Sequence, residues 1–349
     1  MKNLIIAVVF GALISAGCAT DSAVTAEETF SPSENRAAWL QDAKWGVMVH
    51  YQPEWLAEQN GLDPITTTGQ WNELVDNFDC EGLAKQLSDA GAGYLIMTVR
   101  HGPVFFISPN SAYDRITGQV PSRCSNRDLI ADLADALAKY DIKLIAYMLG
   151  QAPSMNEAEI KGFGVRSDDY YRAGPFTRNA EALLRWQDVF REYSLRWGDK
   201  VAGWWIDACY RPNTMYRQPD APNFESMAAA ARAGNPDSIV TFNPGRFPRL
   251  KSITIHEDYI AGEVNDLDRL SFRYRHEGMI DKKQIHALSF LGSFWGQGEP
   301  RFTDEEVVRY SLNVREVDGA ITWDCPVYPN GLIKEPFMKQ LRSIGKAVR

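Results

Sequence analysis

The stretch Val201-Ala202-Gly203-Trp204-Trp205-Ile206-Asp207-Ala208-Cys209-Tyr210 has the composition of an apolar strand that ends in a carboxylate. Burying an unpaired carboxylate is costly, so Asp207 is poor core material. We therefore expect Asp207 at the C-terminal end of a strand, facing a pocket. The alternative is an aspartate that caps the next helix or pairs with an arginine.

Short β-branched or aromatic runs alternate with longer amphipathic segments on both sides of this strand, a pattern typical of parallel α/β folds. The predicted strands are Trp45–His50, Tyr94–Val99, Lys143–Leu149, Val201–Ile206, Ser238–Phe242, Ile253–Ile260, His286–Leu291 and Gly319–Trp323. The predicted helices are Cys80–Ala90, Arg127–Tyr140 opened by Ser125 or Asn126, Asn179–Trp197, Asn223–Ala233 and Thr303–Val317. Eight alternations favour a single (β/α)8 TIM barrel over two domains.

Polar and aromatic residues gather at the predicted strand ends. They are His50, Arg100, His101, Tyr147, Asp207, Asn243, Glu263 and Trp295. Active sites of this fold lie at that end of the barrel, so the group predicts a site. Aromatic side chains near strand ends also provide flat surfaces for the C–H face of a sugar ring, although such residues are more often ordinary core. The aromatic candidates are Trp71, Tyr147, Trp204, Trp205 and Trp295.

The first 36 residues are predicted to lie outside the barrel. Residues 1–18 combine Lys2, a short apolar run and small residues before Cys18, which is the pattern of a signal peptide with a lipobox-like cysteine. Residues 19–36 have the composition of a flexible tether, and residues 37–349 are predicted to form the catalytic domain. We expect export and a periplasmic, outer-membrane or cell-surface lipoprotein, with Cys18 the only membrane attachment. Without lipidation the protein would be periplasmic or secreted.

The net charge of -8 argues against nucleic acid as a partner. No cysteine or histidine spacing predicts a metal site, and the glycine-rich phosphate signatures are missing from the sequence, so no cofactor is implied. Besides Cys18, the chain has Cys80, Cys124, Cys209 and Cys325, which could be bridged or free.

Several motifs, in order from Trp39 to Val348, resemble those of the α-L-fucosidases of glycoside hydrolase family 29. They are Trp45–His50, Phe78–Ala92 with Tyr94–His101, Gly203–Asp207, Glu257–Glu263, Gly319–Gly331 and Leu341–Gly345. The resemblance implies a catalytic barrel and an oligosaccharide or polysaccharide substrate with α-L-fucosidic or fucose-like linkages. It also implies a retaining mechanism, with Asp207 as nucleophile and Glu263 as acid/base.

The sequence also suggests alternative acids and a set of substrate-binding residues. Glu257, and after it His256, are the alternatives to Glu263 as the acid. His50 and His101 are expected to bind sugar hydroxyls, because neutral imidazole both donates and accepts, and to help keep Asp207 ionised. Trp71, Tyr147, Trp205 and Trp295 complete the predicted substrate-binding set.

The sequence also departs from the family pattern. Gly102 replaces the second histidine of a pair, and Gln70 precedes Trp71 where a glutamate is common. The β-sandwich that typically follows the barrel is not expected in this chain. These changes leave open a hydrolase of a different sugar, a non-catalytic carbohydrate-binding protein on a degenerate barrel, or an inverting hydrolase. The sequence does not indicate the oligomeric state.

Overall fold

A computed structural model describes residues 35–102, 105–165, 178–211, 216–247, 249–272, 275–276 and 278–348. The predicted signal peptide, Cys18 and nearly all of the tether lie outside these residues. Within the described part, no helix is long and apolar enough to cross a membrane. Residues from Asn35 onward form one compact unit.

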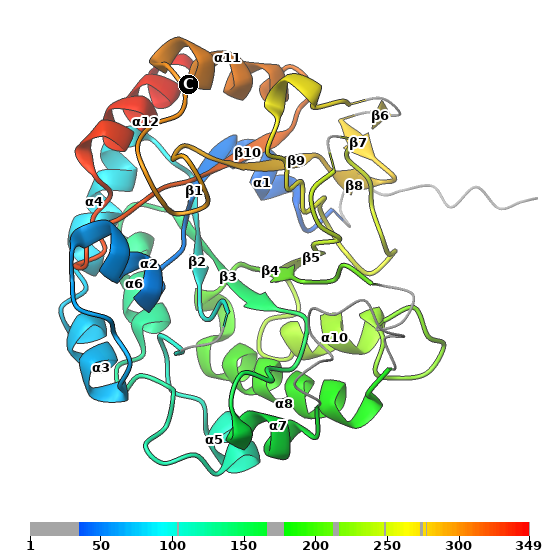
Figure 1. The fold of residues 1–349 in the computed structure, drawn as a ribbon. Coiled ribbons are helices and arrows are strands. Elements are labelled where there is room, and N and C mark those ends of the chain that lie inside the picture. Colours follow the sequence, from blue (N-terminus) through cyan, green and yellow to red (C-terminus); the bar gives the residue numbers. More distant parts are fainter. Residues whose placement is uncertain are drawn as a thin grey trace, which may run out of the picture. The chain divides into compact units, whose positions relative to one another are not determined.

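A curled, wholly parallel sheet of seven strands occupies the centre of this unit, in the order β5-β4-β3-β2-β1-β10-β9 (Figure 1). The strands are β1 (Trp45–Val49), β2 (Tyr94–Thr98), β3 (Lys143–Leu149), β4 (Gly203–Asp207), β5 (Ile239–Phe242), β9 (His286–Phe290) and β10 (Ala320–Asp324). The prediction of a TIM-like barrel is confirmed, and these seven strands lie within two residues of their predicted bounds.

The eighth position of the barrel is filled by residues 258–264, which bridge the two edges of the sheet without forming a regular strand. On one side, the backbone N–H of Asp258 donates to the carbonyl of Val240 in β5 at 2.8 Å. On the other side, the N–H of Val264 donates to the carbonyl of Leu288 in β9 at 2.9 Å. The predicted strand Ile253–Ile260 is therefore wrong: its first half forms turns, and the pairing segment lies further along the chain.

Helices surround the sheet (Figure 1). They are α1 (Ala38–Ala43), α2 (Pro53–Asn60), α3 (Thr68–Asp76), α4 (Cys80–Ala90), α5 (Ser111–Thr117), α6 (Leu129–Ala138), α7 (Glu157–Phe163), α8 (Ala180–Trp197), α10 (Phe224–Ala231), α11 (Asp304–Arg315) and α12 (Glu335–Val348). The described residues also include two short 3-10 helices, η2 (Gly198–Lys200) and η3 (Leu267–Arg269), and a small antiparallel sheet of β6 (Arg275–His276), β7 (Met279–Ile280) and β8 (Lys283–Gln284).

Side-chain capping explains several helix boundaries. The predicted capping box of Thr303 and Glu306 begins α11, and Gly91 ends α4 in the left-handed conformation. Helix α6 is capped by Asp128, whose side chain accepts from the N–H of Ala131. The predicted caps Ser125 and Asn126 are therefore wrong, because Asp128 is the first residue whose side chain reaches the open turn.

Successive side chains along each strand point to opposite faces of the sheet. They form an outer core under the helices and an inner core inside the barrel. In β4, Trp204 and Ile206 belong to the outer core and Trp205 to the inner core. Asp207 follows Trp205 by two residues, so its side chain faces the barrel axis. The same period points His50, two residues after Met48, into the barrel. Strand alternation thus directs the polar side chains at the strand ends into one space.

Candidate active site

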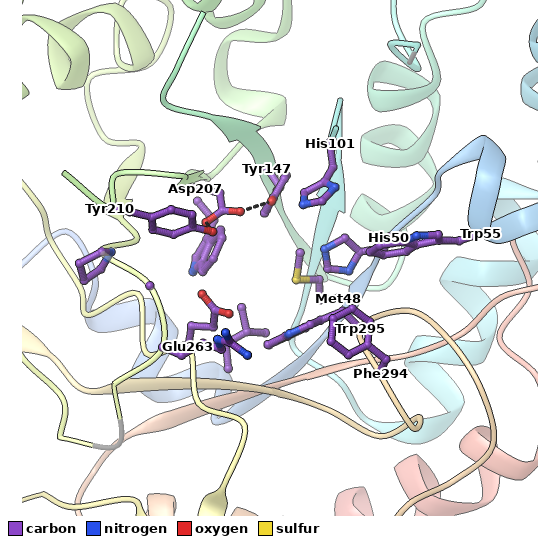
Figure 2. Close-up of a pocket in the computed structure, with 15 residues that line it drawn as sticks. Met48, His50, Trp55, His101, Tyr147, Asp207, Tyr210, Glu263, Phe294 and Trp295 are labelled. Carbon is purple, nitrogen blue, oxygen red and sulfur yellow. Dashed lines mark hydrogen bonds between the residues drawn. The ribbon is translucent and has the colours of Figure 1, made fainter. Parts of the chain in front are cut away.

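A cavity of about 490 Å³ lies at the C-terminal ends of the strands (Figure 2). It is lined by Met48, His50, Trp55, His101, Tyr147, Trp205, Asp207, Tyr210, Pro244, Gly245, Arg246, Glu263, Leu288, Phe294 and Trp295. Its size is within the usual range for small-molecule sites. Seven of the eight residues predicted for the site lie here, and the exception is Trp71.

Asp207 is the last residue of β4 and accepts hydrogen bonds at both carboxylate oxygens. The hydroxyl of Tyr147 donates to Oδ2. The amide of Asn243 donates to Oδ1 at 2.7 Å, and the hydroxyl of Tyr210 donates to the same oxygen at 3.2 Å. Among the described residues, these two tyrosines and the asparagine donate to Asp207, whereas His50 and His101, the donors expected from the sequence, do not. The result is an aspartate held in one orientation by neutral donors.

Asn243 joins the two carboxylates of the cavity. Its Nδ2 donates to Asp207 Oδ1 at 2.7 Å and to Glu263 Oε2 at 2.6 Å. The sum of these two distances, about 5.3 Å, is the upper limit for the separation of the two oxygens. The orientation of the amide is fixed, because its Oδ1 accepts from the N–H of Gly245 at 3.0 Å. Asp207 and Glu263 therefore converge on one space (Figure 2).

Glu263 lies on the irregular segment that closes the barrel. Burial and, after it, the negative charge of Asp207 raise the pKa of its carboxyl to about 7, although Asn243, Arg246 and His50 act in the opposite direction. A carboxyl of this kind is protonated in much of a population at neutral pH and can donate a proton. The two neighbouring carboxyl groups are thus placed in different surroundings, one hydrogen-bonded by three donors and one largely desolvated.

His50 and His101 face each other at an edge-to-face angle, with their ring centres 5.4 Å apart. His50 Nδ1 lies 2.8 Å from Oδ1 of Asp324, a fully buried carboxylate at the end of β10. Burial, and then the neighbouring His50, lower the pKa of His101 to about 4, so His101 is neutral at neutral pH. A neutral His101 can offer a nitrogen atom to hydroxyl groups in the cavity, which His50 also lines.

Aromatic rings cover much of the remaining wall. Tyr147 and Trp205 are stacked, with ring centres 5.2 Å apart and an interplanar angle of 13°. Trp295 packs against Phe290, and Phe294 beside it is about half exposed at 48%. Flat apolar faces next to hydrogen-bonding groups are suited to a sugar ring, which has an apolar C–H face and polar edges.

Trp71 does not line the cavity, so its predicted place in the substrate-binding set is wrong. It lies in α3, is fully buried, and donates from Nε1 to the carbonyl of Phe106 at 2.9 Å. Its ring stacks on Phe105, outside the cavity. The amphipathic period of α3 turns Trp71 toward the outer core, and the neighbouring Gln70 takes part in the helix-capping box with Thr67. The resemblance placed this tryptophan in a binding role that its helix does not allow.

We expect Trp71→Ala to lower the free energy of unfolding by about 3–5 kcal/mol, because it removes a buried ring and leaves a cavity. Urea unfolding measures this loss. Leu195→Ala is the matched control, since Leu195 is 60% exposed in α8 and its truncation is expected to change stability little. Weaker sugar binding by Trp71→Ala at unchanged stability would contradict this position for the ring.

Two other residues singled out in the sequence, Glu257 and Arg100, do not line the cavity. Glu257 is fully buried, accepts from the backbone N–H groups of Ile253 and Phe242, and does not line the cavity. Arg100 forms a buried ion pair with Glu159 at 2.7 Å. Of the two glutamates weighed as the acid, only Glu263 lies at the cavity.

Some cavity or supporting residues were not predicted for the site. Asp324 could have been recognised from Ala320-Ile321-Thr322-Trp323-Asp324, which ends an apolar strand in a carboxylate just as β4 does. Trp55 carries a weaker signal, because it lies in the first turn of the helix that follows β1. Tyr210 and Phe294 lie on irregular segments, where no periodic pattern predicts orientation.

No protein-family model and no curated protein matches this chain. Among solved structures, it is similar to the endo-fucoidan hydrolase MfFcnA4 from glycoside hydrolase family 107. The identity is 14% and the TM-score 0.66, over 89% of this chain and 53% of that one. This is a likeness of fold. The chain spans about half the length of that protein.

Two further structures cover the chain to the same extent. The endo-fucoidan hydrolase P5AFcnA, from family 107, is 17% identical with a TM-score of 0.65, over 90% of this chain and 93% of that one. The α-L-fucosidase AlfC from Lactobacillus casei is 15% identical with a TM-score of 0.61, over 89% and 97%. The fold expected from the resemblance to fucosidases is therefore found.

Proposed function

We propose that this protein is a retaining glycoside hydrolase that cleaves α-L-fucosidic or fucose-like linkages in oligosaccharides or polysaccharides. The observation that carries the proposal is the pair of carboxylates, Asp207 and Glu263, that share the amide nitrogen of Asn243. Retaining glycosidases have carboxyl groups about 5–5.5 Å apart, whereas inverting enzymes leave room for a water at about 6.5–9.5 Å. A limit of about 5.3 Å between the bridged oxygens favours retention over inversion.

Each carboxyl then has one role in each of two steps. A carboxylate oxygen of Asp207 attacks the anomeric carbon, while Glu263 gives its proton to the departing glycosidic oxygen, so that the C–O bond breaks as the ester bond forms. In the second step, Glu263 removes a proton from water, and the hydroxide attacks the same carbon and releases Asp207. The pKa of Glu263, raised to about 7, fits a group that gives and then takes a proton near neutral pH.

The sugar assignment rests on two supports. The fold is shared with an α-L-fucosidase and with endo-fucoidan hydrolases. The cavity also combines His50, His101 and the Tyr147–Trp205 stack, which supply hydrogen bonds and a flat face to one ring. Export and lipid anchoring at Cys18 are proposed from the sequence alone, and would place the enzyme where extracellular glycans are available.

The test is hydrolysis of an aryl α-L-fucoside and of fucan oligosaccharides by the purified chain, with proton NMR of the first product. We expect the released sugar to have the α configuration before it mutarotates. A β product would indicate inversion. Lack of release from every substrate, with thermal stabilisation by one of them, would favour a carbohydrate-binding protein instead.

Asn243→Ala is expected to lower kcat/KM about 10- to 100-fold, because both carboxylates lose a positioning donor. Donation from Asn243 lowers the pKa of Glu263, so its removal should raise that pKa and move the basic limb of the rate profile to higher pH. A pH profile of kcat/KM checks both effects. An unchanged profile would show that Asn243 does not act through Glu263.

A further inference from the structure

Asp324 is a buried carboxylate behind the cavity residue His50, and the proposed catalytic steps do not use it. It is fully buried at the end of β10 and has two polar contacts from different parts of the barrel. Its Oδ1 lies 2.8 Å from Nδ1 of His50, and its Oδ2 accepts from the backbone N–H of Gly296. One carboxylate therefore holds both a cavity histidine and the turn that carries Phe294 and Trp295.

These contacts determine which nitrogen of His50 carries the proton. A carboxylate can only accept, so Nδ1 must donate to it. In the neutral ring, Nε2 is then left with a lone pair and is a hydrogen-bond acceptor. Among the described residues, none forms a hydrogen bond to Nε2, and His50 lines the cavity.

Packing fixes the direction of the ring as well. His50 lies 5.3 Å from the ring centre of Trp55 and 6.1 Å from that of Trp295 (Figure 2). Gly296 has φ +57, and a Cβ atom on it would lie 2.9 Å from the Cβ of His50. The turn therefore packs directly on the histidine, and only a glycine allows this approach together with that backbone conformation.

We propose that Asp324 is a positioning residue that makes Nε2 of His50 a hydrogen-bond acceptor beside Trp295, so that the site selects a sugar with a free hydroxyl at the position facing His50. This proposal rests on the proposed function for its substrate. A methyl ether or a sulfate ester at that position has no proton to give, so it leaves Nε2 unpaired and is rejected.

Asp324→Asn tests the assignment sharply. The N–H of Gly296 can be satisfied only by the amide oxygen, so the amide NH₂ must face His50 and donate to Nδ1. The proton of the neutral ring then moves to Nε2, and the cavity-facing nitrogen becomes a donor. We expect kcat/KM for the unmodified sugar to fall about 10- to 100-fold. We also expect the preference for hydroxyl over methoxy to fall at one ring position only, measured with mono-O-methyl aryl fucosides.

The tautomer of His50 is measured by ¹⁵N NMR of histidine-labelled protein. For the wild type, this measurement does not depend on catalytic activity. The wild type is expected to carry the His50 proton on Nδ1. His286 is an internal reference, because its Nδ1 contacts the carbonyl oxygens of Ile260 and Ala261 and should stay protonated in Asp324→Asn. Asp89→Asn, at an exposed ion pair with Lys85, is the matched surface control and should leave spectrum and specificity unchanged.

A wild-type His50 that carries a proton on Nε2 at neutral pH, whether alone or together with the proton on Nδ1, would overturn the proposal, whether or not the protein is active. Equal loss of rate on hydroxyl and methoxy substrates at every position would also overturn it, because a merely structural role predicts that result. A protein that shows the expected tautomer and its switch, but hydrolyses none of the fucosides, would support the role of Asp324 and refute the proposed function instead.

Discussion

Asp207→Asn is expected to reduce kcat on every substrate by a factor of about 10³ or more, with little change in the thermal unfolding temperature. The amide cannot form the ester to the anomeric carbon, so the covalent step is lost while the cavity keeps its shape. If the amide oxygen takes the place of Oδ1, it still accepts from Asn243 and Tyr210, and the amide NH₂ can donate to the hydroxyl oxygen of Tyr147. Initial rates with an aryl α-L-fucoside measure the effect.

Chemical rescue separates a lost nucleophile from a damaged fold. Asp207→Gly leaves space next to the anomeric carbon, and added azide is expected to restore cleavage of an activated aryl fucoside and to give a glycosyl azide of inverted configuration. Asp188→Asn, at an exposed ion pair in α8, is the matched control and should keep full activity. Residual activity of Asp207→Asn above a few per cent of wild type would remove this residue from the nucleophile role.

Glu263→Gln has the second large expected effect, and its size should depend on the leaving group. For an alcohol or sugar leaving group, which needs a proton, we expect kcat/KM to fall about 10²- to 10⁴-fold. A dinitrophenyl leaving group needs no proton, so its release should be affected much less. The group must be protonated to act, and its pKa is about 7, so wild-type kcat/KM should fall as the pH rises above about 7. That basic limb should disappear in the variant.

Glu257→Gln is the control for this assignment. Burial also raises the pKa of Glu257 to about 7, but its carboxylate accepts from backbone N–H groups outside the cavity. We expect the variant to keep both the basic limb and the wild-type response to the leaving group. A basic limb that vanishes in Glu257→Gln and persists in Glu263→Gln would exchange the roles of the two glutamates.

The periodic spacing of apolar residues in helices and strands was sufficient to predict most of the barrel. Apolar runs such as Lys143–Leu149 have the length and composition of buried parallel strands, and their ends carry the polar side chains of the cavity. The sixth predicted strand in chain order, Ile253–Ile260, was misplaced because residues 258–264 pair with both neighbouring strands through isolated backbone hydrogen bonds, without the regular alternation that marks a strand.

Site residues at the end of a predicted strand could be predicted from the sequence. Contacts between residues far apart in the sequence could not. Asp207 and His50 continue the inward alternation of β4 and β1. The amide that joins two carboxylates, and the Asp324 partner of His50, become visible only when strands far apart in sequence are brought together. Trp71 illustrates the reverse error, because a motif likeness does not reveal which face of a helix is turned inward.

The most direct test of the proposed mechanism is to trap the glycosyl-enzyme with 2-deoxy-2-fluoro-fucosyl fluoride and locate the label by peptide mass spectrometry. The fluorine slows both steps, and the reactive leaving group allows the first to proceed, so a covalent ester should accumulate. We predict one label per chain, on Asp207. A label on another residue, or inactivation-free turnover with a product of inverted configuration, would contradict a retaining mechanism with Asp207 as the nucleophile.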